Sequence, residues 1–332
     1  MHPFKAFRIH ERDGHIAGRF EDISLDDLTP GEVVVDVLYS GINYKDALAA
    51  TGAGKILRRY PLVGGIDLAG VVKSSDDASF TPGDAVLVTG SGLSETFDGG
   101  YARLARVKAE SVIPMPPGLD AFRAMALGTA GFTAALAIHR MERNGQKPEN
   151  GPVVVTGATG GVGSVAIDML TARGYEVIAV SGKADATAYL RALGATSVVS
   201  RAEFALGSRP LEPARYAGAI DNVGGEMLAG LTRQIDFWGN IASVGLAGGA
   251  KLETTVMPFI LRGINLLGIN SSATRRPERL EVWRRIATDL APRRLERIVT
   301  RTIPFEELPG AFQAYLDGKV RGRTVVNIGS GT

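Results

Sequence analysis

The sequence predicts an α/β protein in which a doubly wound parallel sheet is joined to a β-rich domain. The first third of the chain reads as short β segments between glycine and proline turns, and the centre alternates strands with helices. A glycine-rich turn joins a strand to a helix over residues 153–163. At 332 residues the chain is long enough for two cores. We expect residues 1–124 and 271–332 to form the β-rich domain and residues 125–270 the sheet.

The β-rich part is indicated by strands that follow turn signals. Residues 32–38 come after Pro30-Gly31, and residues 84–88 come after Pro82-Gly83. Two polar clusters, residues 40–46 and 64–67, lie between the strands. The alternating segment 323–328 is expected to return to this domain as a strand, and no long helix is expected in the first third.

The central part alternates between two periodicities. Strands are expected at 153–156, 176–180, 197–199, 218–221, 240–244 and 265–269. Helical segments at 165–170, 184–193 and 227–235 separate them, with further helices at 124–140 and 277–290. Six strands with intervening helices are typical of a doubly wound parallel sheet.

The glycine turn of this sheet has the context of a dinucleotide-binding fingerprint. The β-branched run 153–156 breaks into Gly157, Gly160, Gly161 and Gly163, and an apolar helix follows. Glycines allow the backbone to approach a pyrophosphate, and a helix N-terminus supplies free amides. The alternative is a tight strand–helix turn without a ligand.

The residues after the second strand favour NADPH over NADH. An acidic residue about 20 positions after the glycines would select NAD by binding the ribose 2′-hydroxyl. This chain has Ser181, Gly182 and Lys183 instead. A hydroxyl and an ammonium suit a 2′-phosphate, which a carboxylate would repel. The alternative is that Lys183 is a solvated residue at a helix start.

Composition excludes several kinds of site. The 37 basic and 35 acidic residues leave a net charge of +2, so we expect neither nucleic acid nor membrane partners. Without cysteine, disulfides, thiolate zinc sites and cysteine nucleophiles are impossible. Residues 1–20 are charged and lack the apolar core of a signal peptide, and we see no apolar run of about 20 residues. We expect a cytoplasmic protein.

The order of these parts resembles the medium-chain dehydrogenase/reductase superfamily, and more narrowly its zinc-independent acryloyl-CoA reductase/quinone oxidoreductase branch. The resemblance covers nearly the whole chain and implies a GroES-like fold for the β-rich domain, a Rossmann fold for the sheet, and a homodimer with strand 265–269 as a candidate contact. The residues that carry it are 43–46, 61–70, 128–134, 181–183, 245–249 and 257–262.

The same resemblance allows the metal question to be answered from residues. Zinc-dependent members carry a cysteine where this chain has Asn43, and a His-Glu pair where it has Ile66-Asp67. Neither Asn nor Ile replaces a thiolate or an imidazole at Zn²⁺. The four histidines (His2, His10, His15 and His139) have no companion at ligand spacing. We predict no metal.

The resemblance also assigns cofactor contacts. Tyr44 is expected beside the cofactor, and for Ile260 a core position is an equal alternative. The loop that contains Asn222 follows the fourth strand, and ligands bind at such carboxyl ends. The expected contacts are Thr159, Gly160, Gly161 and Val162 at the pyrophosphate, Ser181, Gly182, Lys183 and Arg201 at the 2′-phosphate, and Leu246, Ile260 and Ser271 around the nicotinamide.

A site without zinc suits reduction of a carbon–carbon double bond conjugated to a carbonyl. The substrate spreads the incoming charge into an enolate, so hydrogen-bond donors suffice. Tyr44 is the candidate that donates the proton or holds nicotinamide and substrate, with water as the alternative donor. Asn43, Asp46 and Asp67 would form the polar frame. For the two aspartates a purely structural role is an equal alternative.

The substrate stays open at this point. The family pattern has a Trp and a Gly-Glu-x-His-Trp-Gly-Gly stretch near the substrate cleft, whereas residues 89–100 here contain neither His nor Trp, and Asn270 replaces an Asp. An enoyl-CoA, a larger enone and a quinone are therefore candidates, and a non-catalytic NADPH-binding protein is a third reading. Four arginines (262, 275, 276 and 279) could meet CoA phosphates, although a solvated face is expected.

Overall fold

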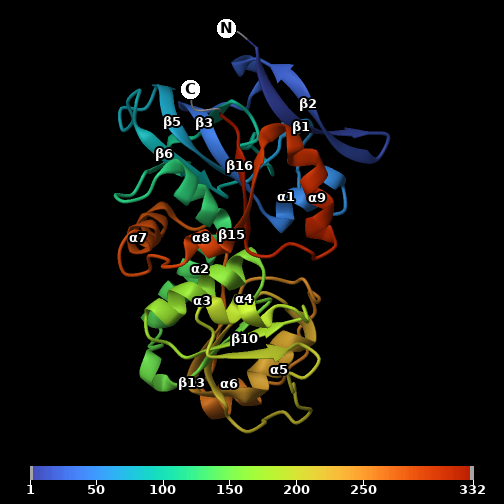
Figure 1. Cartoon of the computed structure of the whole chain (residues 1–332), viewed down its shortest axis with the longest axis vertical. Coiled ribbons are helices and arrows are strands. Elements are labelled where there is room, and N and C mark those ends of the chain that lie inside the picture. Colours follow the sequence, from blue (N-terminus) through green and yellow to red (C-terminus); the bar gives the residue numbers. More distant parts are fainter. Residues whose placement is uncertain (1–2, 330–332) are drawn as a thin grey trace. The chain divides into compact units, whose positions relative to one another are not determined.

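The structure, a computed structural model, describes residues 3–329. The chain forms two compact units. The first contains the chain up to Thr129, Ser271–Ala287 and the chain from Val299 onward; the second contains Ala130–Asn270 and Thr288–Ile298. Figure 1 follows the chain through its elements in sequence colours.

This division differs from the expected boundaries in two places. The first break falls after Thr129, inside helix α2 (Ala121–Arg143), rather than after residue 124. Residues 288–298 belong to the second unit because Arg294, just before helix α8 (Leu295–Ile298), donates from its N–H and its Nη1 to buried Asp168, 2.9 Å in each case. A short segment held by one ion pair leaves no periodic signal in the sequence.

The first unit contains a seven-stranded sheet in the order β15-β16-β3-β5-β6-β8, with β7 also paired to β3. Its strands are β3 Val33–Ile42, β5 Asp67–Ser75, β6 Ala85–Thr89, β7 Leu104–Val107, β8 Ile113–Pro114, β15 Val299–Pro304 and β16 Arg323–Asn327. Strand β16 pairs antiparallel with β3, with Val325 opposite Gly41. The predicted return of segment 323–328 into this domain is confirmed.

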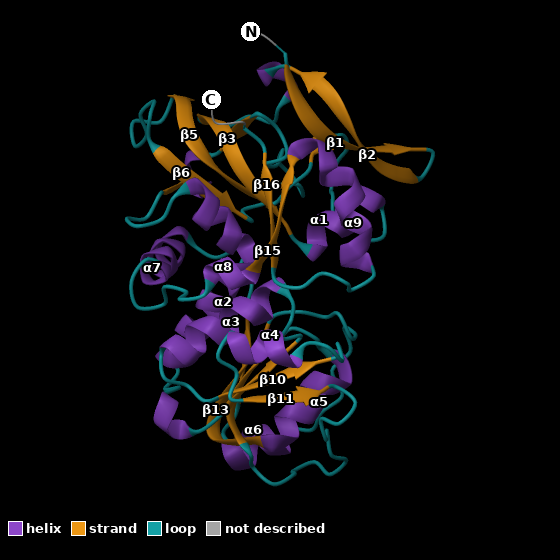
Figure 2. Cartoon of the chain, in the orientation of Figure 1, coloured by secondary structure: helices purple, strands orange, loops and turns teal. Residues whose placement is uncertain are grey.

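A smaller sheet and several helices complete this unit. The charged N-terminal segment forms β1 (Phe4–Arg12) and β2 (His15–Ile23), and β1 also pairs with β4 (Leu62–Val63). Figure 2 shows helices α1 (Tyr44–Thr51) and α9 (Leu308–Leu316) side by side. The remaining helices are α7 (Arg276–Ile286) and the 3₁₀ turns Leu25–Asp27, Ala109–Ser111 and Phe305–Glu307.

Helix α1 arises where the sequence suggested only a polar cluster between strands. Asn43 is its N-cap, and the Asp46 carboxylate three residues later accepts the Asn43 N–H at 2.8 Å. This reciprocal arrangement is a capping box, which stabilises the first turn of a helix. The polar residues of the cluster therefore begin a helix instead of forming a loop.

The second unit is a six-stranded parallel sheet in the order β11-β10-β9-β12-β13-β14, as predicted for a doubly wound fold. Its strands are β9 Val153–Thr156, β10 Val177–Ser181, β11 Ser197–Ser200, β12 Tyr216–Asp221, β13 Ile235–Ser243 and β14 Asn265–Gly268. Figure 1 shows α3 (Gly161–Ala172) and α4 (Thr187–Ala192) on one side, and α5 (Gly225–Gln234) and α6 (Met257–Arg262) on the other. A 3₁₀ turn covers Pro148–Asn150.

Helix α2 corrects one expectation from the sequence. Among residues 3–329 it is long and apolar enough to cross a membrane by length and composition, although no such run was expected. Its most apolar window is 78% buried in the protein, which is typical of a core helix. The helix itself was expected at 124–140, but its apolar length was underestimated because alanine and glycine dilute its apolar character.

Candidate active site and cofactor cradle

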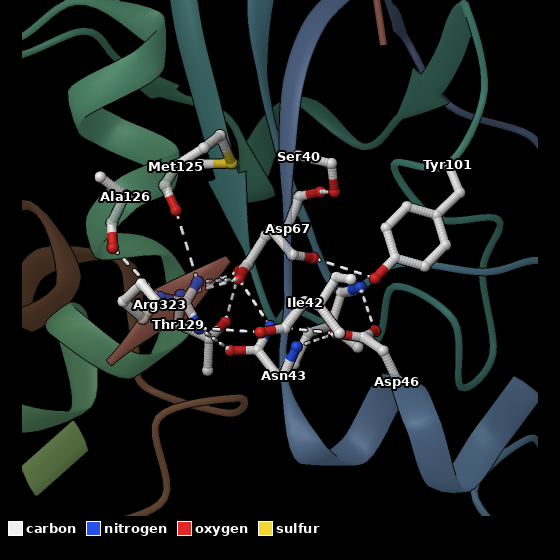
Figure 3. A network of polar contacts seen from close by, with 12 residues as sticks. Ser40, Ile42, Asn43, Asp46, Asp67, Tyr101, Met125, Ala126, Thr129 and Arg323 are labelled. Atoms are coloured by element: carbon white, nitrogen blue, oxygen red, sulfur yellow. Dashed lines mark hydrogen bonds and ion pairs between the residues drawn. The ribbon is translucent and has the colours of Figure 1, made fainter. Parts of the chain in front are cut away.

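A buried polar network in the first unit surrounds Asp67, the first residue of β5 (Figure 3). The Asp67 side chain is fully buried. Its carboxylate accepts hydrogen bonds from the Thr129 hydroxyl at 2.6 Å, the Thr129 N–H at 3.0 Å and the Asn43 Nδ2 at 2.8 Å. Asp67 thus ties the start of α1 to helix α2.

Arg323 completes the network, and the sequence analysis missed it. The guanidinium is 2% exposed; its Nε donates to the Ala126 carbonyl at 3.1 Å and its Nη1 to the Ile42 carbonyl at 3.0 Å and to Asn43 Oδ1 at 2.9 Å. Its Nη2 lies 3.8 Å from Asp67 Oδ2. The sequence does carry one signal: Arg323 stands at the head of an apolar strand, where a buried arginine would need hydrogen-bond partners.

Two glycines make room for the guanidinium. Gly128 kinks α2 with φ +53°, and a Cβ there would lie 2.6 Å from both Arg323 Nη2 and Asp67 Oδ2. A Cβ at Gly41 would lie 2.7 Å from Arg323 Nη2. Real Cβ atoms essentially never come so close, so a side chain at either position would have to displace the guanidinium.

Asp46 points inward from α1. Its Oδ1 accepts the Ile66 N–H at 2.9 Å and its Oδ2 the Asn43 N–H at 2.8 Å, and its side chain is buried. Burial, followed by the nearby negative charge of Asp67, raises the pKa of Asp46 to about 7. Through its hydrogen bonds to Asn43 and Ile66, Asp46 holds the start of α1 in place.

Tyr44 is the accessible member of the predicted catalytic set. It is the first residue of α1 and 51% exposed, whereas Asn43 is half-buried and Asp46 and Asp67 are buried. The structure brings Asn43, Asp46 and Asp67 into one hydrogen-bonded cluster, and the adjacent Tyr44 side chain reaches solvent.

The second unit carries the glycine turn at the end of β9. Gly157 has φ +57°, and a Cβ on Gly163 would lie 2.5 Å from the Gly157 carbonyl oxygen, so turn and helix are closely packed. Helix α3 begins at Gly161, and the amides of its first turn have no intrahelical acceptor. Thr159, Gly160, Gly161 and Val162 lie together at this helix N-terminus, and helix N-termini in general favour anions such as phosphate.

The neighbouring strand β12 ends at Asp221, and Asn222 follows it directly. The Thr156 hydroxyl donates to Asp221 Oδ1 at 2.6 Å, and Asn222 Nδ2 donates to the Thr156 carbonyl at 2.8 Å. Within residues 3–329, Asn222 Oδ1 is buried and has no hydrogen-bond partner. An acceptor without a donor beside a glycine turn fits a ligand that brings a hydroxyl or amide.

The residues predicted to contact the 2′-phosphate lie at the ends of β10 and β11. The Arg201 N–H donates to the Ser181 carbonyl at 2.7 Å, and the Lys183 N–H donates to the Ser181 hydroxyl at 3.1 Å. A Cβ on Gly182 would lie 3.4 Å from the Arg201 guanidinium carbon. The structure thus places the exposed Arg201 guanidinium over the Gly182 backbone.

The residues predicted around the nicotinamide lie in both units. Leu246 is 68% exposed and borders a hollow of about 230 Å³ that is lined by residues 224–225, 228, 243–246 and 249–252. Ile260 is 72% exposed, so the alternative of a core position is wrong. The half-buried Ser271 belongs to the first unit.

The expected solvated arginine face is wrong for three of its four members. Arg279 is buried and its guanidinium donates to the carbonyls of Thr89, Ser271 and Ser272. Arg276 donates to the Val112 carbonyl, and Arg262 to the Arg233 carbonyl. These cations satisfy backbone carbonyls, and burial lowers the pKa of Arg279 to about 10.

Sequence models of two protein families match this chain. "Alcohol dehydrogenase GroES-like domain" matches residues 29–117, and "Zinc-binding dehydrogenase" matches residues 161–288. The acrylyl-CoA reductase AcuI of Ruegeria pomeroyi is 48% identical over 96% of this chain and 96% of its own length. The putative quinone oxidoreductase YhfP of Bacillus subtilis is 44% identical over 98% of this chain and 99% of its own length. The chain belongs to the medium-chain dehydrogenase/reductase superfamily.

Solved structures place this reductase in the same branch. YhdH of Escherichia coli with bound NADPH superposes with a TM-score of 0.94 at 44% identity, covering 98% of this chain and 100% of that one. Bacillus subtilis YhfP with NAD bound superposes with a TM-score of 0.96 at 44% identity and the same coverage. The reductase is an NAD(P)H-dependent oxidoreductase of the acrylyl-CoA reductase or quinone oxidoreductase type.

The zinc implied by one family description does not fit this reductase. Where zinc-dependent members hold the metal, Asn43 Oδ1 accepts a hydrogen bond from the Arg323 guanidinium, and both Asp67 oxygens accept bonds from protein groups. Among the described residues, no group of three or more His, Cys, Asp or Glu side chains could hold a metal ion. The Arg323 guanidinium occupies the Asn43 amide oxygen, and Thr129 and Asn43 occupy the Asp67 carboxylate, so neither group is left for a metal ion.

Proposed function

We propose that this reductase uses NADPH to reduce the carbon–carbon double bond of an α,β-unsaturated CoA thioester such as acryloyl-CoA, without a metal. The observation that carries the proposal is the Asn43–Asp67–Arg323 network in place of zinc ligands, with the exposed Tyr44 beside it. Such a site offers hydrogen-bond donors instead of a Lewis acid, which suffices when the substrate delocalises the incoming charge. The identity to acrylyl-CoA reductases supports this substrate class.

The residues of the site have separate tasks in this proposal. When bound, NADPH supplies the hydride that adds to the β-carbon. The Tyr44 hydroxyl delivers the proton to the α-carbon, and its place at the accessible N-terminus of α1 supports this role. Asn43, Asp46 and Asp67 hold that terminus through the hydrogen bonds of Figure 3.

The cradle of the second unit supports NADPH as the cofactor. Ser181 and Arg201 meet at the carboxyl end of β10, where a 2′-phosphate would gain a hydroxyl and a guanidinium. The first-turn amides of α3 would hold the pyrophosphate, and Asn222 Oδ1 would accept a hydrogen bond from the cofactor. The relative with NAD bound makes NADH the necessary comparison.

The test is NADPH oxidation, followed by its absorbance, with acryloyl-CoA, crotonyl-CoA and 1,4-benzoquinone in parallel and with NADH as the control. Saturable turnover of an enoyl-CoA with NADPH preferred is the expected result. Turnover of the quinone alone would replace the proposal by a quinone or enone reductase, a function that the identity to YhfP favours. Tight NADPH binding without oxidation by any acceptor would indicate a non-catalytic binding protein.

We also propose a homodimer that forms through the second unit. Strand β14 ends the sheet order, and unpaired edges of this kind recruit further strands. Large exposed apolar side chains precede β14 in the chain, on β13 and at α6, namely Phe237, Trp238, Val256, Met257, Ile260 and Leu261. Light scattering is expected to give twice the mass of one chain, and Leu267→Lys on β14 is expected to give the monomer.

The cytoplasm remains our predicted compartment, which fractionation of expressing cells would test.

A further inference from the structure

Both ends of loop 90–98 are fastened beside Asp67. Thr89, the last residue of β6, pairs with Asp67 in the β5–β6 ladder, and the next N–H, that of Gly90, donates to the Ile66 carbonyl at 2.8 Å. At the other end the Gly99 N–H donates to the Val63 carbonyl at 2.9 Å. The loop therefore leaves and re-enters the fold at the strand end that carries the polar network.

The backbone of this loop is strained. Ser91 and Ser94 have φ values of +53° and +56°, in the left-handed region that side chains other than glycine rarely adopt. Such conformations are unfavourable and persist only where surrounding contacts impose them. At the end of the loop, buried Asp98 accepts the N–H groups of Thr29 and Val63, each at 2.7 Å. In the middle of the loop the Glu95 carbonyl accepts the Arg58 N–H at 2.8 Å.

The Glu95 side chain adds a second attachment at the same point of the loop. Its carboxylate forms an ion pair with Lys45 and accepts a hydrogen bond from the Ser272 hydroxyl at 3.3 Å, and its side chain is 19% exposed. The Ser91 N–H donates to the Ser272 carbonyl at 3.1 Å, which holds the strained residue against the same segment.

Two of the three segments that meet at Glu95 carry predicted site residues. Lys45 directly follows Tyr44, and Ser272 directly follows Ser271. An exposed ion pair would be worth little, but this pair is partly buried, shares a third partner and holds a strained backbone. Its position therefore couples the loop to the accessible end of α1.

We propose that Glu95 is a positioning residue of the substrate site. Through Lys45 and Ser272 it holds loop 90–98 in one conformation beside Tyr44, and the loop then forms a wall that binds the unsaturated substrate. The inference rests on the proposed function. It assigns Glu95 to substrate affinity, and neither to hydride or proton transfer nor to cofactor binding.

The kinetic test compares Glu95→Gln, Lys45→Met and the charge-exchanged double variant Lys45→Glu/Glu95→Lys with the wild-type enzyme. Glu95→Gln is expected to raise KM for the substrate several-fold while kcat and the KM for NADPH change less than about twofold. The double variant is expected to recover most of the substrate affinity, because it restores an ion pair in the same place. The control is Asp317→Asn, which breaks the exposed Lys319–Asp317 pair (2.8 Å) outside this loop.

Hydrogen exchange supplies a readout that does not depend on turnover. Amides of loop 90–98 are expected to exchange faster in Glu95→Gln, at the wild-type rate in Asp317→Asn, and near the wild-type rate in the double variant. Unchanged exchange, or a lower Tm without a change in substrate KM, overturns the inference. A wild-type chain that turns over no acceptor overturns the proposed function and the substrate role together, while the exchange data still decide whether Glu95 holds the loop.

Discussion

Arg323 and Asp67 form a buried pair of opposite charges that do not hydrogen-bond directly, since their closest nitrogen and oxygen atoms are 3.8 Å apart. Each completes its hydrogen bonds elsewhere, Arg323 with backbone carbonyls and Asn43, and Asp67 with Thr129 and Asn43. Asn43 bridges the two, donating to the carboxylate and accepting from the guanidinium. The positions of the two charges therefore depend on Asn43, which holds both side chains.

Removing the guanidinium leaves a buried carboxylate without its counter-charge. Arg323→Met is expected to lower the free energy of unfolding by about 3–5 kcal/mol, as when one partner of a buried pair is removed. Urea unfolding measures this. Lys5→Met, which breaks the exposed Lys5–Glu306 pair, is expected to cost less than about 1 kcal/mol. Equal costs for the two variants would contradict the importance of the network.

Gly128 lies against the network, and Gly118 provides a comparison at another glycine with positive φ. Both have positive φ, but a Cβ at Gly118 meets nothing within 4 Å, whereas one at Gly128 meets Arg323 and Asp67. Gly118→Ala is expected to cost about 1–2 kcal/mol of stability, and Gly128→Ala about 1–3 kcal/mol more. Thermal or urea unfolding compares them, and equal losses would show that the network tolerates a displaced guanidinium.

The raised pKa of Asp46 predicts a pH-dependent stability. Its pKa moves from 3.8 to about 7 on folding, mainly through burial, so between these values the folded protein binds more protons than the unfolded chain. The free energy of unfolding should then fall as pH rises through this interval, by at most about 1.4 kcal/mol per pH unit from this group. Asp46→Asn is expected to flatten the slope of urea-unfolding energies against pH. A variant with the wild-type slope would contradict the assignment.

Arg201 is predicted to select the cofactor. Arg201→Ser should raise KM for NADPH about tenfold or more, because a charge-assisted bond to the 2′-phosphate is lost, and should leave KM for NADH unchanged. Initial-rate kinetics with both cofactors measure the ratio. Arg191→Ser on α4 serves as the control. If both cofactors lose affinity equally, Arg201 does not read the 2′-phosphate.

Tyr44 is predicted to donate a proton. Tyr44→Phe should lower kcat by about 10² while the protein keeps its wild-type stability, since the side chain is 51% exposed. Steady-state kinetics with the preferred acceptor and a melting curve test both statements. An unchanged kcat would assign the proton to water and leave Tyr44 the task of packing on the cofactor.

Features set by neighbouring residues could be predicted from the sequence. The β-branched run 153–156 and the glycines after it specify a strand, a tight turn and a helix through local sterics. The six parallel strands followed from the same alternation of short-range patterns. Asn43 and Asp67 could be singled out because the resemblance aligns them with the zinc ligands of other family members. That comparison uses only their positions in the chain.

Tertiary structure decided the features that depend on distant residues. Arg323 joins Asn43 and Asp67 only because β16 pairs with β3, and Arg294 reaches Asp168 only when α8 packs on the second unit. Glu95 finds Lys45 and Ser272 across three separate segments. Arginine and glutamate are usually solvated, so the residue type alone does not reveal which of them are buried. The physical reason is that a buried charge is defined by its partners, and folding alone brings those partners together.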